Sequence, residues 1–234
     1  MALDLYAGPL SRYHSGDWET IGQQMARADG VSVVTVRVGQ GGGSPTPQNE
    51  VTEVLHRWRN ATCSHLSGQG LATVTWSDEP TMPYLTDRPG WEGQTGLLFK
   101  YAYLKNPDLV PPIHVPPVDG NADDPGWRAA TEEPSLFLIL ANCECWLPGD
   151  FQAMFEHATI TGHRANFSSV GMLNLALDQV CELWQKERSD VELLSTDQPD
   201  SHAHLDEAAL HGLAVFCRVA SFAAKHSVPV ILDY

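Results

Sequence analysis

The most continuous apolar run in the chain covers residues 136–140, between Pro134 and the turn at Pro148-Gly149. A run this short, with turn residues at both ends, is typical of a strand that is buried on both faces. We therefore predict that residues 136–140 form the central strand of a sheet and that other elements cover it on both sides.

Shorter β-branched or alternating stretches predict the remaining strands. They cover residues 3–6, 31–38, 71–76, 97–104 and 228–232. In residues 97–104, Leu97, Phe99 and Tyr101 alternate with a second set of side chains, which indicates a strand with two distinct faces. We expect the last strand to lie in the same sheet as residues 136–140.

Helices are predicted where apolar side chains recur every three or four residues. This pattern covers residues 15–28, 47–58, 127–133, 170–184 and 206–222. Ser168 or Ser169 is placed to cap the helix over 170–184. Residues 77–96 and 187–198 lack the pattern and are expected to be mostly loop, whereas residues 151–160 fit either a helix or a strand.

The order of these elements indicates the fold class. Strands and helices mix without strict alternation, which favours one α+β (mixed α/β) domain with a central mixed sheet flanked by helices. A chain of 234 residues can bury such a core without disulfide bonds. Six prolines interrupt residues 106–126, so two lobes divided in this segment are the alternative.

Charge narrows the classes of partner. The chain has 29 acidic and 14 basic side chains, a formal net charge of -15. Such a field repels phosphate backbones and anionic lipid headgroups and attracts basic proteins, so we expect neither nucleic-acid nor membrane binding. Solubility is the alternative explanation of the acidic excess.

Cysteine usage and the N-terminal sequence indicate the compartment. The five cysteines are odd in number and widely spaced, which makes a poor disulfide framework. The first residues do not combine a basic segment with an apolar one, and the sequence contains no stretch of about 18 apolar residues. We expect a protein of the cytoplasm, where thiols stay reduced.

One candidate metal site is the sequence His202-Ala-His204-Leu-Asp206. Two alternate imidazoles and a carboxylate suit zinc or manganese. The pattern resembles the first part of the metallo-β-lactamase ligand motif, with Glu207 where that motif has its last histidine. The alternative is a solvated acidic loop in which Asp206 caps the next helix.

A second candidate combines Cys143 and Cys145 with His157 and His163. In a strand the two thiols would point to one face, where they could share a metal ion, or one of them could act as a nucleophile beside a histidine. Structural zinc sites use wider cysteine spacing, and buried cysteines are commonly small core residues. A core role is therefore the alternative.

Two further motifs invite a chemical interpretation. The glycine-rich stretch at residues 39–45 follows a predicted strand, but it lacks the Gly-Lys-Ser/Thr ending of a P-loop, which favours a surface loop. His14, Ser15 and Asp17 suggest a hydrolytic triad, although triad members meet through the fold rather than through the sequence. Helix capping by Ser15 explains the same residues.

Candidate partner-binding residues lie in two segments. Tyr84, Arg88 and Trp91 occur on a predicted long loop and are residue types that anchor protein interfaces. Asp197 and Asp200 belong to an acidic stretch that could contact a basic partner. Packing of the aromatic loop on the body of the protein is the alternative.

In overall character the chain resembles the immunity proteins of bacterial toxin systems. An acidic, single-domain chain without a catalytic motif and with aromatic loops fits proteins that bind a toxin and block its active site. The resemblance implies a non-enzymatic protein whose partner is a basic toxin or effector, with no required cofactor. The alternative is a small hydrolase that depends on zinc or manganese, or on a thiol.

Overall fold

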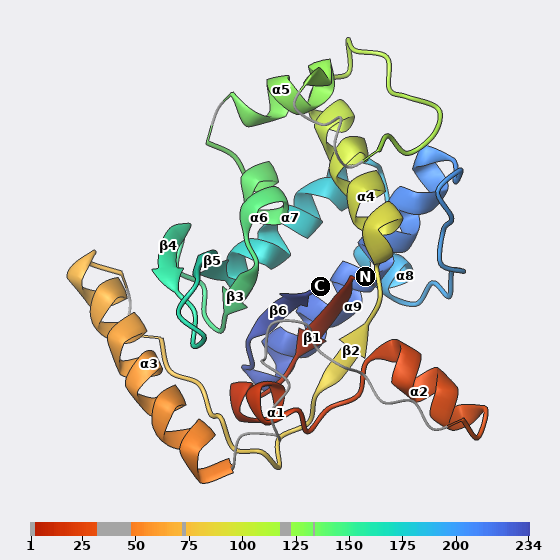
Figure 1. Cartoon of the computed structure of the whole chain (residues 1–234). Helices are drawn as coiled ribbons and strands as arrows, with labels where there is room; N and C mark the ends of the chain where they lie inside the picture. Colours follow the sequence, from red (N-terminus) through yellow and green to blue (C-terminus); the bar gives the residue numbers. More distant parts are fainter. Residues whose placement is uncertain (1–2, 32–47, 72–73, 118–122, 133) are drawn as a thin grey trace.

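The computed structural model describes residues 3–31, 48–71, 74–117, 123–132 and 134–234 (Figure 1). The described residues form a six-stranded mixed sheet in the order β2-β1-β6-β3-β5-β4. The strands are β1 (Asp4–Ala7), β2 (Leu85–Asp87), β3 (Cys145–Leu147), β4 (Phe155–Ala158), β5 (Arg164–Ser169) and β6 (Val230–Asp233). Strands β3 and β5 run parallel and the other neighbours are antiparallel. Helices flank this sheet, which confirms a single α+β domain.

The helices account for most of the remaining regular structure. They are α1 (Leu10–Ser15), α2 (Ile21–Ala28), α3 (Gln48–Gly68), α4 (Gly90–Lys105), α5 (Pro125–Thr131), α6 (Leu136–Asn142), α7 (Val170–Leu183), α8 (Arg188–Glu192) and α9 (Leu205–His226). Ser169 caps α7 as predicted, since its side chain accepts a hydrogen bond from the backbone of Met172. Helices α3, α5, α7 and α9 and strands β1 and β6 confirm their predicted types. Within the ambiguous residues 151–160, the structure forms β4.

The prediction that residues 136–140 form the central strand is wrong. They form helix α6, in which Phe137, Ile139 and Leu140 are buried. A short apolar run has no clear period, so the sequence does not distinguish a buried strand from a buried helix. The last strand, β6, pairs instead with β3, where Cys145 lies opposite Ile231.

The predicted strand at 97–104 is also wrong, because these residues belong to α4. Leu97 and Phe99 are buried, but so are Leu98 and Ala102 from the other half of the alternation. The alternating pattern therefore reflects a helix that is buried on most sides rather than a strand with two faces. The predicted loop over 77–96 contains β2 and the start of α4, from Gly90 onward.

Three smaller predictions need correction. The helix expected over 15–28 begins later, as α2 at Ile21, where Thr20 forms a capping box. Ser15 is instead the last residue of α1, which Gly16 ends in a left-handed conformation at φ 75°. Residues 74–76, expected as a strand, have no strand pairing, and α8 interrupts the loop expected over 187–198. The predicted strand over 31–38 and the glycine-rich stretch at 39–45 lie outside the described residues, apart from Val31.

Helices α4, α6, α7 and α9 cover one face of the sheet (Figure 1). Trp146 of β3 and Val230 of β6 point to this face and join a large buried cluster that includes Leu213 and Phe216. Helices α4 and α9 approach closely at glycines: a Cβ added at Gly212 would lie 2.1 Å from the backbone oxygen of Gly93. This face is closely packed.

Helix α9 runs through the middle of that cluster. Among the described residues it is long and apolar enough to cross a membrane, but 67% of its most apolar stretch is buried inside the protein. Burial on the sheet therefore accounts for its composition.

Helices α1 and α3 cover the opposite face. Neighbouring strand residues alternate between faces, so Cys145 and Leu147 of β3 join a second cluster with Leu10, Leu55 and Phe167. This second cluster is smaller than the first, and it borders the cavity described below.

Candidate functional site

The predicted aromatic loop, with Tyr84, Arg88 and Trp91, packs against other parts of the protein. Tyr84 is half-buried and stacks on Tyr6 at 6.0 Å between ring centroids. Arg88 donates to buried Asp4 at 2.6 Å. The ring of half-buried Trp91 lies 5.8 Å from that of Tyr234. The structure therefore places these three predicted partner-binding residues in intramolecular contacts.

The predicted acidic residues are exposed to solvent. Asp197 and Asp200 lie on the segment between α8 and α9, and Asp206 and Glu207 follow on the first turn of α9. No lysine or arginine occurs from residue 189 to residue 217. Lys100 of α4 reaches the first turn of α9, where its Nζ lies 2.7 Å from Asp206 Oδ1. Arg188 and Arg218 contact the other end of the stretch, at Glu192 and the backbone oxygen of Leu194.

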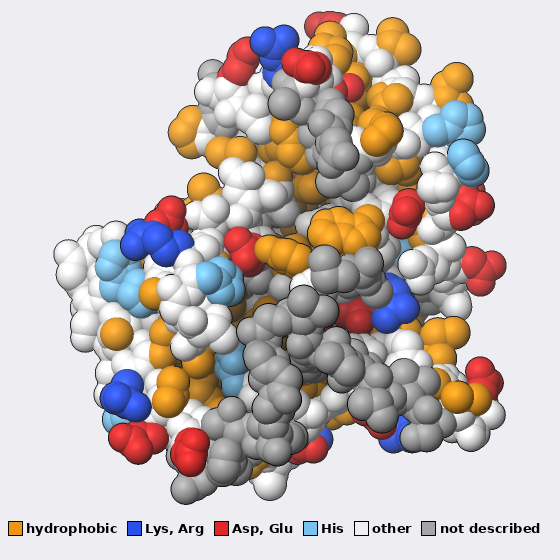
Figure 2. All heavy atoms as spheres, in the orientation of Figure 1, with side chains coloured by type: hydrophobic (Ala, Val, Ile, Leu, Met, Phe, Trp, Pro, Cys, Tyr) orange, Lys and Arg blue, Asp and Glu red, His pale blue; other side chains and the backbone are white. Residues whose placement is uncertain are grey.

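The proline-rich segment packs against this acidic stretch. The backbone N–H of Leu205 donates to Ile113 O at 2.9 Å, and that of Val115 donates to Ala203 O at 3.3 Å. Two apolar side chains beside these contacts face solvent, Val110 at 88% exposure and Ile113 at 67%. We call this surface the acidic face: Val110, Ile113, His114, Asp197, Asp200, His202, His204, Asp206 and Glu207. Figure 2 shows acidic, histidine and apolar side chains together along its right-hand margin.

The candidate metal ligands do not converge. His204 caps α9 and accepts a hydrogen bond from the backbone of Asp206, whose carboxylate faces Lys100. His202 contributes its backbone oxygen, 3.0 Å from His114 Nδ1. Among the described residues, no group of three or more His, Cys, Asp or Glu side chains is arranged to hold a metal ion.

The candidate thiols are separated by the sheet. Cys143 ends α6 and joins the cluster on the α9 side, whereas Cys145 joins the cluster on the α3 side, so the prediction of a shared face is wrong. Burial raises the pKa of Cys143 to about 12, and the charge of Glu144 adds to this effect. Burial also raises the pKa of Cys145 strongly. Both thiols are therefore protonated at neutral pH, which opposes nucleophilic catalysis.

The N-terminal candidate triad has structural contacts instead. Ser15 ends α1, and its hydroxyl donates to the backbone oxygen of Arg12 at 3.2 Å. The His14 ring lies edge-on to Tyr13 at 5.0 Å between centroids. These contacts fix the end of a helix and show no arrangement of nucleophile and base.

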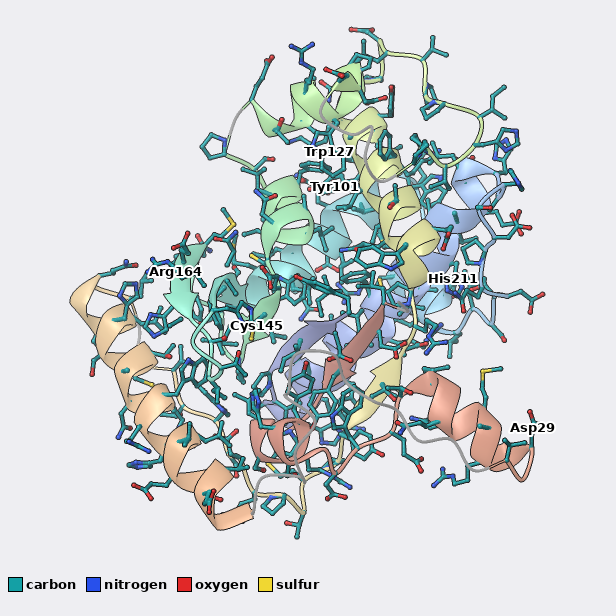
Figure 3. All side chains as sticks on the ribbon, in the orientation of Figure 1. Asp29, Tyr101, Trp127, Cys145, Arg164 and His211 are labelled. Atoms are coloured by element: carbon teal, nitrogen blue, oxygen red, sulfur yellow. The ribbon has the colours of Figure 1, made fainter. Side chains whose placement is uncertain are left out.

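A cavity of about 220 Å³ opens on the α3 side of the sheet. Its floor is made by β3, β5 and β6 through Cys145, Phe167 and Ile231. Helix α1, Trp58 of α3 and the turn between β4 and β5 form its walls. Figure 3 labels Cys145 on the floor of this cavity and Arg164 on the neighbouring β4–β5 hairpin, where Arg164 forms an ion pair with Glu156.

Polar side chains gather at the rim of the cavity. Tyr234 Oη donates to Glu144 Oε2 at 3.2 Å, and His163 Nε2 lies 3.8 Å from the same oxygen. Tyr13 Oη donates to Asp233 Oδ1 at 2.5 Å. Burial raises the pKa of Tyr234, and the charge of Glu144 and its hydrogen bond raise it further. The carboxylates of Glu144 and Asp233 give the rim its acidic character.

Sequence reasoning named His14, Cys145 and His163 as candidates for other sites, but it did not predict that they line one cavity. Glu144 lies between Cys143 and Cys145, and no motif marks it as a site residue. Tyr13 comes from the start of the sequence, and Asp233 and Tyr234 come from its end. The antiparallel pairing of β1 with β6 brings those ends together. The sequence holds no signal for this pairing beyond the strand character of each segment.

Comparisons of the chain with models of known families, with curated proteins and with solved structures found no match. The acidic face and the cavity are therefore the two features from which a function can be inferred. The acidic face offers exposed charge and exposed apolar side chains over a broad surface. The cavity offers a small volume that is open to solvent and lined in part by aromatic side chains.

Proposed function

We propose that this chain is an acidic binding protein that neutralises a basic protein partner, as the immunity proteins of bacterial toxin systems do. The acidic face carries this proposal. It combines four exposed carboxylates, on Asp197, Asp200, Asp206 and Glu207, with the exposed apolar side chains of Val110 and Ile113. Protein interfaces commonly bury apolar side chains at their centre and keep charged ones at their rim.

The charge of the acidic face suits a partner of opposite charge. Complementary charges steer two proteins together and raise the association rate, while the apolar side chains contribute area that is removed from water on binding. A chain with a net charge of -15 adds a long-range attraction to any basic surface. Recognition therefore combines fast encounter with local apolar contact.

The proposal places the protein in the cytoplasm of the cell that makes the toxin. The five cysteines are all unpaired in the structure, which is compatible with a reducing compartment. The alternative function, a metal- or thiol-dependent hydrolase, has less support. Its candidate metal ligands point to different partners, and burial keeps its candidate thiols protonated.

Co-expression with the product of the neighbouring gene tests the proposal. We expect that product to be toxic alone, harmless together with this chain, and bound to it in a stoichiometric complex in native mass spectrometry. A harmless neighbour, together with a chain that is found alone, would contradict the proposal.

A pair of charge-matched variants then tests the role of the acidic face. Asp197→Asn with Asp200→Asn removes two carboxylates from it, whereas Asp29→Asn with Glu79→Gln removes two exposed carboxylates elsewhere. Asp29 lies at the end of α2 (Figure 3), an element that contributes no residue to the acidic face. Both variants lose the same net charge, so a difference between them reports the position of the lost carboxylates. We expect only the first variant to protect less well against the toxin. Equal protection by the two variants would count against the acidic face.

A further inference from the structure

The cavity on the α3 side of the sheet is separate from the acidic face, which carries the function proposed above. At about 220 Å³ it is smaller than the 300 to 1,000 Å³ of typical pockets for drug-sized ligands. Its volume suits a group of the size of one amino-acid side chain. A cofactor with a nucleotide or a ring system would not fit inside it.

Glu144 determines the charge that such a group should carry. Its side chain is 33% exposed at the rim, where it contacts the Tyr234 hydroxyl and the His163 ring. The Tyr234 hydroxyl is neutral, and the His163 imidazole offsets the charge of the carboxylate only when the imidazole is protonated. None of the described residues that line the cavity is a lysine or an arginine. A cationic ligand would therefore satisfy a partly desolvated carboxylate.

The walls favour a flat cation over a compact one. Four aromatic side chains line the cavity: Tyr13, Trp58, Phe167 and Tyr234. Aromatic faces attract cations, and a planar guanidinium can stack on them while it donates two parallel hydrogen bonds to a carboxylate. An ammonium group is more strongly hydrated and lacks this planar match.

The remaining lining residues fit the other parts of such a ligand. Leu10 and Ile231 provide an apolar surface for a methylene chain. Thr159 and Thr161, whose hydroxyls are 3.0 Å apart, add oxygen atoms on the hairpin side. The cavity thus has an apolar interior and a polar, negatively charged rim.

We propose that this cavity binds a guanidinium group carried on a short aliphatic chain, with Glu144 as the carboxylate that pairs with it. The ligand class is that of arginine and its derivatives. The guanidinium is supplied either by a free small molecule or by an arginine side chain of a bound protein. The inference stands apart from the proposed toxin-neutralising function and can hold or fail without it.

Titration calorimetry with arginine amide tests the proposal. We expect saturable binding to one site and no binding of citrulline amide, which has nearly the same shape without the charge. Lysine amide should bind more weakly than arginine amide. These comparisons use the unmodified protein, so they do not depend on the folding of any variant.

Glu144→Gln is the matching variant, with Glu182→Gln on an exposed position of α7 as the control for net charge. We expect Glu144→Gln to weaken the binding of arginine amide at least tenfold and Glu182→Gln to leave it unchanged. Absence of saturable binding to the unmodified protein would overturn the proposal. Equal losses in both variants, or equal affinity for lysine amide, would overturn it as well.

The same reagents distinguish the two sources of the guanidinium. If a partner protein supplies the guanidinium, arginine amide competes with that partner for the cavity. Glu144→Gln and Asp197→Asn then weaken the complex independently of each other. If the ligand is a free small molecule, a complex formed by the acidic face is unaffected by Glu144→Gln, although arginine amide still binds. A missing partner would contradict the proposed function but would leave the calorimetric result intact.

Discussion

The two faces of the central sheet are covered in different ways. On one face α9 lies against α4 and α7, and backbone contacts at Gly93 and Gly212 bring α4 and α9 together without space between them. On the other face α3 and α1 leave a cavity of about 220 Å³ over β3, β5 and β6. The close-packed face stabilises the fold, and the less tightly covered face leaves room for a ligand.

Truncation of a core leucine should show this difference most strongly. Leu213 on α9 is fully buried, whereas Ile160 at the cavity wall is only partly buried. We expect Leu213→Ala to lower the free energy of unfolding by about 2–5 kcal/mol, because it creates a void in a packed core. Ile160→Ala should cost about 1 kcal/mol, since solvent already reaches its surroundings. Urea denaturation measures both, and similar losses would contradict the comparison.

A methyl group added between α4 and α9 should have the next largest effect. The Cβ of Gly212→Ala would lie 2.1 Å from the Gly93 oxygen, so the helices must move apart. We expect a loss of about 1–3 kcal/mol in the free energy of unfolding. Gly68→Ala at the end of α3 is the control, because a Cβ there would meet nothing within 4 Å. If both variants keep the stability of the unmodified protein, the close approach of α4 and α9 is not essential.

The pH dependence of stability should reveal a smaller effect on the α3 side. Burial lowers the pKa of His157, and the neighbouring His65 and Arg164 lower it further. In the unfolded chain this histidine has an ordinary pKa of about 6.5. Around and below that pH the unfolded chain therefore binds more protons than the folded chain, until His157 is protonated in both. The contribution of His157 to stability is therefore complete above about pH 6.5 and is lost as the pH falls below it.

Replacement of this histidine removes that part of the pH dependence. We expect the melting temperature of His157→Gln to decrease less between pH 7 and pH 5 than that of the unmodified protein. His226→Gln, at the end of α9 on the other side of the sheet, is the control. Identical curves for His157→Gln and the unmodified protein would show that His157 does not titrate differently on folding. Solvent screening of the half-exposed ring keeps the expected difference small.

The sequence predicted the fold class and several elements but misplaced the centre of the sheet. Residues 136–140 and 97–104 are mostly apolar because their helices are buried on most sides, and such burial weakens the period that distinguishes a helix from a strand. Where burial is one-sided, as in α7, the spacing of Leu173, Leu177 and Val180 predicted the helix correctly.

The candidate sites differ in how far local sequence reveals them. The exposure of Asp197 and Asp200 follows from residue type alone, because aspartate side chains mostly stay in solvent. The contact between residues 113–115 and 203–205 joins parts of the chain that no local pattern connects. The cavity depends on Tyr13, Glu144 and Tyr234, which meet only after β6 has paired with both β1 and β3.

The most direct test of the toxin-neutralising function is the association rate of the complex at low and high salt. If the acidic face steers a basic partner, the association rate constant falls as the ionic strength rises, while the dissociation rate changes little. Asp197→Asn with Asp200→Asn should associate more slowly at low salt and show a weaker salt dependence than Asp29→Asn with Glu79→Gln. An association rate that is the same at low and high salt, and the same in both variants, would contradict the account.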